Sequence, residues 1–171
     1  MQEVAKGIQE MGFDATTLED VLTVFNTLFS IIPIIFTIVG LLASFVAAVG
    51  IINTMIMSVY ERTKVIGVMK SVGAKNSDIL TLFILEAGFI GFFGGLAAVV
   101  VSAILMELVN KTLVDTVLPK LEITGIDRIF ITPWELVAVA IIFSTIVGVL
   151  AGIYPAFRAS RLNPVESLRH E

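Results

Sequence analysis

The sequence lacks the residues that most catalytic and metal sites need. It has no cysteine, and its one histidine, His170, is next to the C-terminus. A disulfide framework and a cysteine metal site are therefore excluded, and one histidine cannot supply a zinc cluster. The sequence contains neither a phosphate loop GxxxxGK[ST] nor an HExxH motif. We therefore predict no catalytic, cofactor-binding or metal site, no ATP hydrolysis by this chain, and no nucleic-acid partner.

Charge is also scarce, and its distribution is uneven. Charged residues make up 15% of the 171 residues, whereas a soluble domain carries about a quarter. Charges are absent from residues 21–60, 87–106 and 136–157. About 20 apolar residues cross the hydrocarbon core of a bilayer, and a buried helix of a soluble protein rarely runs so long without a charge. The sequence predicts an all-α integral membrane protein with three transmembrane helices.

Basic residues indicate the orientation of these helices. They concentrate in the segment 58–78 and in the tail after Phe157, at Arg62, Lys64, Lys70, Lys75, Arg158, Arg161 and Arg169. Basic loops lie on the cytoplasmic side of a membrane. We expect a multi-pass protein of the cell membrane, with the middle loop and C-terminus cytoplasmic and the N-terminus outside.

The N-terminal segment must then be exported, yet it carries no signal. Residues 1–20 show no basic start, short apolar run and cleavage site. One hypothesis is that this chain is the C-terminal part of a longer protein.

Helix signals divide the chain further. We expect a stalk and first transmembrane helix over 21–57, a loop over 58–77, a second transmembrane helix over 78–109, an outer loop over 110–132, a third transmembrane helix over 133–155, and a tail with a short helix over 156–171. The predicted N-caps are Thr16, Ser77, Thr132 and Asn163, in three cases with a glutamate three residues later, at Glu19, Glu135 and Glu166. Pro33 leaves two alternatives for the first helix: a continuous stalk, or an interfacial segment that turns into the membrane there.

Small residues recur four apart in each crossing. They are Gly40, Ser44 and Ala48; Ala87, Gly91 and Gly95; Ser144, Gly148 and Gly152. Such ridges let helices approach closely in lipid. They indicate packing within one chain or pairing with a second copy, and we favour a homodimer.

Two polar residues lie within the crossings. Glu86 is either a functional site or a polar contact that locks the loop to the bundle, to Lys70 or to a backbone donor, and we favour the contact. Asn53 predicts an interhelical hydrogen bond, and the alternative is that it lines a dimer seam. At the outer end of the second crossing, Glu107 is expected to reach the lipid headgroups.

The middle loop is amphipathic. Val65, Val68, Met69 and Val72 fall at helical spacing, and Gly73 is a natural helix stop. Such a helix either lies on the lipid interface or docks its apolar face into a groove on a cytoplasmic partner. The pattern alone leaves both open.

Three sequence blocks resemble the FtsX-like permease family, which includes MacB-type exporters and lipoprotein-release permeases. The blocks read GIINTMIMSVYERT with the loop that follows, ILEAGFIGFFGG, and YPAFRASRLNPVESLRHE. They stand in the family's order and cover Val39 to the end.

The resemblance implies that the loop is a coupling helix that docks on an ABC-type ATPase. The matching residues are Glu61, Arg62, Thr63, Lys64, Ile66, Gly67, Lys70, Gly73 and Ala74. Val65 stands where the family usually has an acid.

The resemblance also implies a permease subunit that transmits the motion of a separate ATPase across the membrane. MacB-type members have four transmembrane helices, so these three would be the last three, and residues 1–20 the remnant of an extracytoplasmic domain. An extracytoplasmic adaptor is a possible further partner. The alternatives are a non-transport regulator of extracytoplasmic enzymes, and a structural membrane protein with an interfacial loop.

Overall fold

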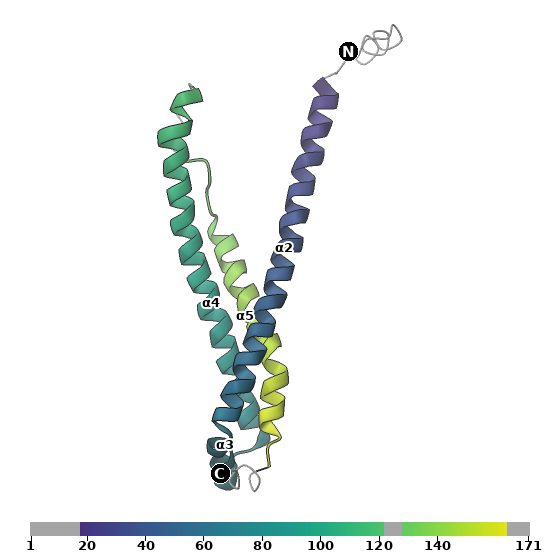
Figure 1. The fold of residues 1–171 in the computed structure, drawn as a ribbon, viewed down its shortest axis with the longest axis vertical. Helices are drawn as coiled ribbons and strands as arrows, with labels where there is room; N and C mark the ends of the chain where they lie inside the picture. The colour runs from purple at the N-terminus through teal and green to yellow at the C-terminus, as the bar shows by residue number, and fades with distance from the viewer. Residues whose placement is uncertain (1–17, 122–127, 164–171) are drawn as a thin grey trace. The chain divides into compact units, whose positions relative to one another are not determined.

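The structure, a computed structural model, describes residues 18–121 and 128–163, and three long helices and one short helix dominate these ranges (Figure 1). Its elements are α2 (Leu18–Glu61), α3 (Thr63–Ser71), α4 (Asn76–Thr112), the π-turn η1 (Leu113–Val117), the 3-10 turn η2 (Pro119–Leu121) and α5 (Trp134–Ser160). No strand occurs in the two described ranges. The predicted all-α fold with three membrane-spanning helices is confirmed, since α2, α4 and α5 are long and apolar enough to cross a bilayer.

α2 begins at Leu18, three residues before the segment 21–57 that the sequence assigns to this helix, and runs for 44 residues. It continues through Pro33, whose ring removes one backbone donor. The hydroxyl of Thr37 donates to the Pro33 carbonyl at 2.7 Å. The chain divides after Phe45 into two compact units, and the whole segment from α3 to α5 belongs to the second. The predicted cap at Thr16 and the predicted helix after Asn163 lie outside the described residues.

α4 starts at a different cap from the predicted one. Lys75 occupies the N-cap, and its backbone N–H donates to Asp78 Oδ2 at 2.9 Å. The hydroxyl of Ser77, the predicted cap, instead donates to Asp78 Oδ1 at 3.3 Å. A carboxylate in the first turn accepts a hydrogen bond more strongly than a hydroxyl and also interacts favourably with the helix dipole. Asp78 is therefore the side chain that accepts from the backbone at the start of α4.

α5 likewise has a different cap from the predicted one, and it begins one residue later than predicted. Pro133 is the N-cap and Trp134 the first helical residue, with Leu136 N–H donating to the Pro133 carbonyl at 3.1 Å. Thr132 does not cap the helix, because its hydroxyl lies against Met106 Sδ of α4.

The side chain of Asn110 in α4 explains why Thr132 lies against Met106. Its buried side chain donates to the Phe130 carbonyl at 2.8 Å and accepts from the backbone N–H groups of Ile129 and Phe130 at 3.2 and 2.9 Å. One amide side chain therefore fixes the segment that leads into α5.

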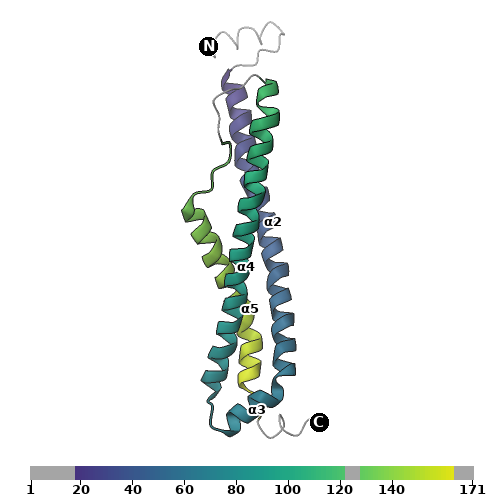
Figure 2. The ribbon, with the colours of Figure 1, turned by 90° about the vertical axis from the view of Figure 1, so that its left-hand side faces the viewer.

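α4 and α5 make the main helix–helix contact, and they lie side by side in the part nearest α3 (Figure 2). A Cβ atom added at Gly148 would lie 2.7 Å from the Ala87 carbonyl oxygen and 2.9 Å from Gly91 Cα. At Gly91 it would lie 2.5 Å from the Ser144 carbonyl oxygen. The structure thus brings together two of the three small-residue ridges.

The remaining members of these two ridges also face each other. A Cβ atom at Gly95 would meet Ser144, and one at Gly152 would meet Ala87. In the third ridge, on α2, a Cβ atom at Gly40 would have no neighbour within 4 Å, and the Ser44 hydroxyl donates back to the Gly40 carbonyl at 2.8 Å. Ala48 is half-buried.

Candidate functional site

α3 is rooted in an apolar cluster where α2 ends and α4 begins, at the lower end in Figure 1. Ile66 is only 2% exposed, and Gly67 beside it is also buried. The cluster consists of Met55, Val59, Ile66, Ile79, Phe83, Ala87, Ala156 and Ala159. Burial of apolar surface contributes about 25 cal/mol per Å². This short helix is therefore held by packing on the membrane helices.

The opposite side of α3, together with its C-cap residue Val72, carries three exposed valines. Val65, Val68 and Val72 are 57%, 48% and 84% exposed, and their spacing of three and four places them on one line along the helix. We call these three residues the valine stripe. Met69, which the sequence pattern grouped with them, packs instead against the apolar cluster.

The predicted amphipathic face therefore needs correction. At 100° per residue, the apolar residues of this segment cover a broad arc of the helix surface. They are Val65, Ile66, Val68, Met69 and Val72. One edge of that arc, Ile66 and Met69, faces the bundle, and the valine stripe faces away. Counting periodicity could not separate the two edges because both are apolar.

A tight turn ends α3, as Gly73 predicted. Gly73 has φ of +110°, a conformation that favours glycine. Its N–H donates to the Lys70 carbonyl at 3.1 Å, and the N–H of Ala74 donates to the Met69 carbonyl at 3.0 Å. These are the two bonds of a Schellman motif, so the path from α3 into α4 is well defined.

Lys70 points inward, toward the end of α5. Its ammonium donates to the backbone carbonyls of Ser160 and Leu162 at 2.6 and 2.8 Å, and to Asn76 Oδ1 at 2.8 Å. Hydrogen bonds that involve a charged group each contribute about 1.5–3 kcal/mol. Lys70 is thus occupied by the end of α5 and the start of α4.

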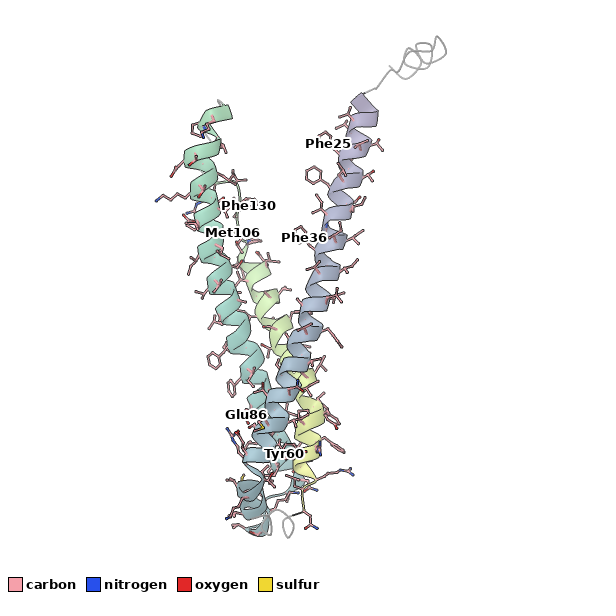
Figure 3. All side chains as sticks on the ribbon, viewed as in Figure 1. Phe25, Phe36, Tyr60, Glu86, Met106 and Phe130 are labelled. Atoms are coloured by element: carbon pink, nitrogen blue, oxygen red, sulfur yellow. The ribbon has the colours of Figure 1, made fainter. Side chains whose placement is uncertain are left out.

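Glu86 makes a polar contact to the middle loop, as the favoured interpretation expects, but its partner is Arg62 and not Lys70. The Arg62 guanidinium, at the junction between α2 and α3, lies 3.4 Å from the carboxylate of Glu86. Glu86 belongs to α4 and is labelled in Figure 3. Lys70 instead contacts the start of α4 and the end of α5. The pair lines an open groove of about 660 Å³ with Leu82, Leu85 and Phe89.

α2 also contacts α5 at this end through an aromatic ring. The Arg158 guanidinium donates to the Tyr60 hydroxyl at 3.0 Å and lies 5.6 Å from the centre of that ring. Tyr60 and Tyr154 are exposed here and Trp134 is exposed at the opposite end of α5, which are the positions that an aromatic belt requires.

The nine residues of the predicted coupling segment fall into two groups. Ile66, Gly67, Lys70 and Ala74 face the bundle to different degrees, and the Thr63 hydroxyl donates to the Val59 carbonyl at 2.9 Å. The exposed members are Glu61, Arg62, Lys64 and Gly73. Val68 and Val72 were outside the nine, although the amphipathic pattern contained them.

Two further polar residues of the membrane helices are exposed. Asn53 is exposed in the single chain, and its interhelical hydrogen bond stays a prediction. Glu107 lies 3.9 Å from Arg128, with both side chains about two thirds exposed, so its nearest charged contact is the outer loop.

Three apolar membrane-length helices joined through a rooted amphipathic helix define a multi-pass membrane protein. The chain belongs to the FtsX-like permease family, since the profile described as FtsX-like permease C-terminal matches residues 37–164. It is thus a member of the FtsX- and MacB-like ABC transporter permeases.

Individual relatives support the same assignment. The chain is 36% identical to an uncharacterized ABC transporter permease of Methanocaldococcus jannaschii, over 97% of this chain and 40% of that protein. It is 31% identical to the ABC transporter permease YtrF of Bacillus subtilis, over 100% of this chain and 40% of that protein. The macrolide export ATP-binding/permease protein MacB of Acinetobacter baylyi is 35% identical over 91% of this chain and 21% of MacB. The chain thus spans about two fifths of the first two relatives.

Proposed function

We propose that this chain is a permease subunit of an ABC-type exporter, and that it transmits ATP-driven motion of a separate ATPase across the membrane. The observation that carries the proposal is the valine stripe on a helix whose other side is rooted in the bundle. The family and the names of the relatives support it. The basic residues of the loop favour a cytoplasmic position for α3.

The rooting of α3 favours a partner protein over a lipid surface. An interfacial helix needs only an apolar face and a polar face. α3 in addition joins α2 through the single residue Arg62, ends in a Schellman turn, and buries Ile66 in the cluster. A helix that must pass on a force requires such connections.

The surface around the valine stripe has the composition of a docking helix. The exposed Glu61, Arg62 and Lys64 surround its first turn, and an amphipathic helix places its apolar residues in a groove while charges at the rim set orientation. Val65 removes the acid that the family usually has, so we expect apolar contacts to dominate here. We further propose a homodimer with its N-terminus outside, and an extracytoplasmic adaptor as a second partner.

A photo-cross-linker at Val68 tests this proposal in the native membrane. We expect p-benzoylphenylalanine at Val68 to form a covalent adduct with a protein that carries a GxxxxGK[ST] motif. The matched control is the same group at Val139 of α5, which is also exposed but lies in a membrane-spanning segment and should give no such adduct. Adducts with lipid alone at Val68 would contradict the proposal and favour a structural protein with an interfacial helix.

A further inference from the structure

We propose that Lys70 joins α3 to the end of α5 as one mechanical unit, so that displacement of α3 moves the third membrane helix directly. The inference rests on the proposed function in taking α3 as the point where force enters. It assigns Lys70 as a positioning residue, one that acts by holding two helices together.

The geometry at the ammonium is complete. A lysine has three donors and no acceptor, and Lys70 has three acceptors at 2.6–2.8 Å. Two of them are backbone carbonyls at the end of α5 and just after it, 90 and 92 residues along the chain. The last carbonyls of a helix have no partner within it and carry the negative end of its dipole. The Lys70 ammonium donates hydrogen bonds to these carbonyls, and its positive charge interacts favourably with the negative end of the dipole.

Lys70 supplies a polar link between α3 and the end of α5. The helix–helix backbone packing is mainly between α4 and α5, and the polar contact from α2 to α5 runs through Tyr60 and Arg158. Without Lys70, α3 would be connected to α5 through the shared apolar cluster and through α4. Apolar contacts have no directional preference, so they permit sliding that three hydrogen bonds resist.

The third acceptor extends the unit to the start of α4. Asn76 is the first residue of α4 and lies close after the Schellman turn. α3, the turn and the ends of both membrane helices therefore share one ammonium. A pull on the valine stripe should reach α4 through the backbone and α5 through Lys70.

Spin labels on α3 and α5 test this link. The chain has no cysteine, so Ser71→Cys with Tyr154→Cys gives one defined pair at two exposed positions. With labelled chain diluted in unlabelled chain in nanodiscs, we expect a narrow distance distribution that stays the same when the ATPase captured at Val68 binds a non-hydrolysable ATP analogue. Lys70→Met should broaden it, whereas Lys75→Met, which removes a neighbouring charge that is exposed, should not.

A second readout separates a mechanical role from a structural one. Lys70→Met should keep affinity for the ATPase and lose the stimulation of its hydrolysis, because the valine stripe is intact. An equally narrow distribution in Lys70→Met would overturn the proposal. If that variant does not fold, a nucleotide-dependent change of the α3–α5 distance in the cysteine pair alone would also overturn it.

The two proposals fail separately. The distance distribution without ATPase depends on Lys70 whether or not an ATPase docks on α3. Absence of an ATPase adduct at Val68 would contradict only the proposed function.

Discussion

Replacement of Val68 by aspartate should abolish docking of the partner ATPase and its stimulation while the chain stays folded. Val68 is half exposed and lies in the middle of the valine stripe, so the folded chain loses little when its side chain changes. In the docked state the same position would bury an unpaired carboxylate. Truncation at the centre of an interface typically costs about 2 kcal/mol or more, and an uncompensated buried charge about 3–5 kcal/mol. We therefore expect affinity to fall by at least about 30-fold, at about 1.4 kcal/mol per factor of ten.

The measurement is binding and hydrolysis by the ATPase captured at Val68, with the variant in nanodiscs. Ser71→Asp is the matched control, because it adds the same charge to an exposed position of the same helix outside the valine stripe. It should change affinity much less. Equal effects of the two substitutions would show that charge on α3, and not the valine stripe, sets docking.

Replacement of Gly91 by leucine should separate α4 from α5. A Cβ atom at Gly91 would lie 2.5 Å from a backbone oxygen of α5 and 3.2 Å from Gly148 Cα, and neither can move without shifting the helix. Overpacking of a core costs about 1–3 kcal/mol when side chains can adjust. Because the obstacle here is backbone, we expect a loss of about 3 kcal/mol or more in the free energy of unfolding.

Gly94→Leu provides the control for this experiment on the same helix. A Cβ atom at Gly94 would have no neighbour within 4 Å, so leucine there should leave stability nearly unchanged in the same mixed-micelle unfolding titration. Similar losses in both variants would mean that lipid contact, rather than the α4–α5 contact, explains the effect.

The fold was largely predictable because its signals are local. Charge-free runs define the three long helices, and Gly73 defines the end of α3, since both depend on residues close in sequence. The small-residue ridges were visible too, but which ridges would meet was not. That depends on the α4–α5 crossing, which brings Gly91 to Gly148.

The site was less predictable because its decisive contacts are distant in sequence. Two partners of Lys70 are backbone carbonyls at the end of α5, and a carbonyl leaves no signature in a sequence. Asn110 likewise holds the backbone of Ile129 and Phe130. Arg62 is the partner of Glu86, and this pairing depends on how the junction between α2 and α3 lies against α4.

The caps failed for a related reason. Ser77 and Thr132 have suitable side chains, yet Asp78 and Met106 contact their hydroxyls instead. A capping motif predicts that a helix begins nearby, and in both cases it does. Which residue caps the helix depends on the neighbouring side chains that compete for the hydroxyl.

Motion of a cytoplasmic ATPase should reach the outer side of the membrane through α3. The most direct test is the distance between spin labels at Leu22→Cys and Ile131→Cys, two exposed positions expected outside, with labelled chain diluted in unlabelled chain. We predict that a non-hydrolysable ATP analogue, bound to the docked ATPase, changes this distance and that Val68→Asp removes the change. An unchanged distance, with ATPase docked and nucleotide bound, would contradict transmission through α3.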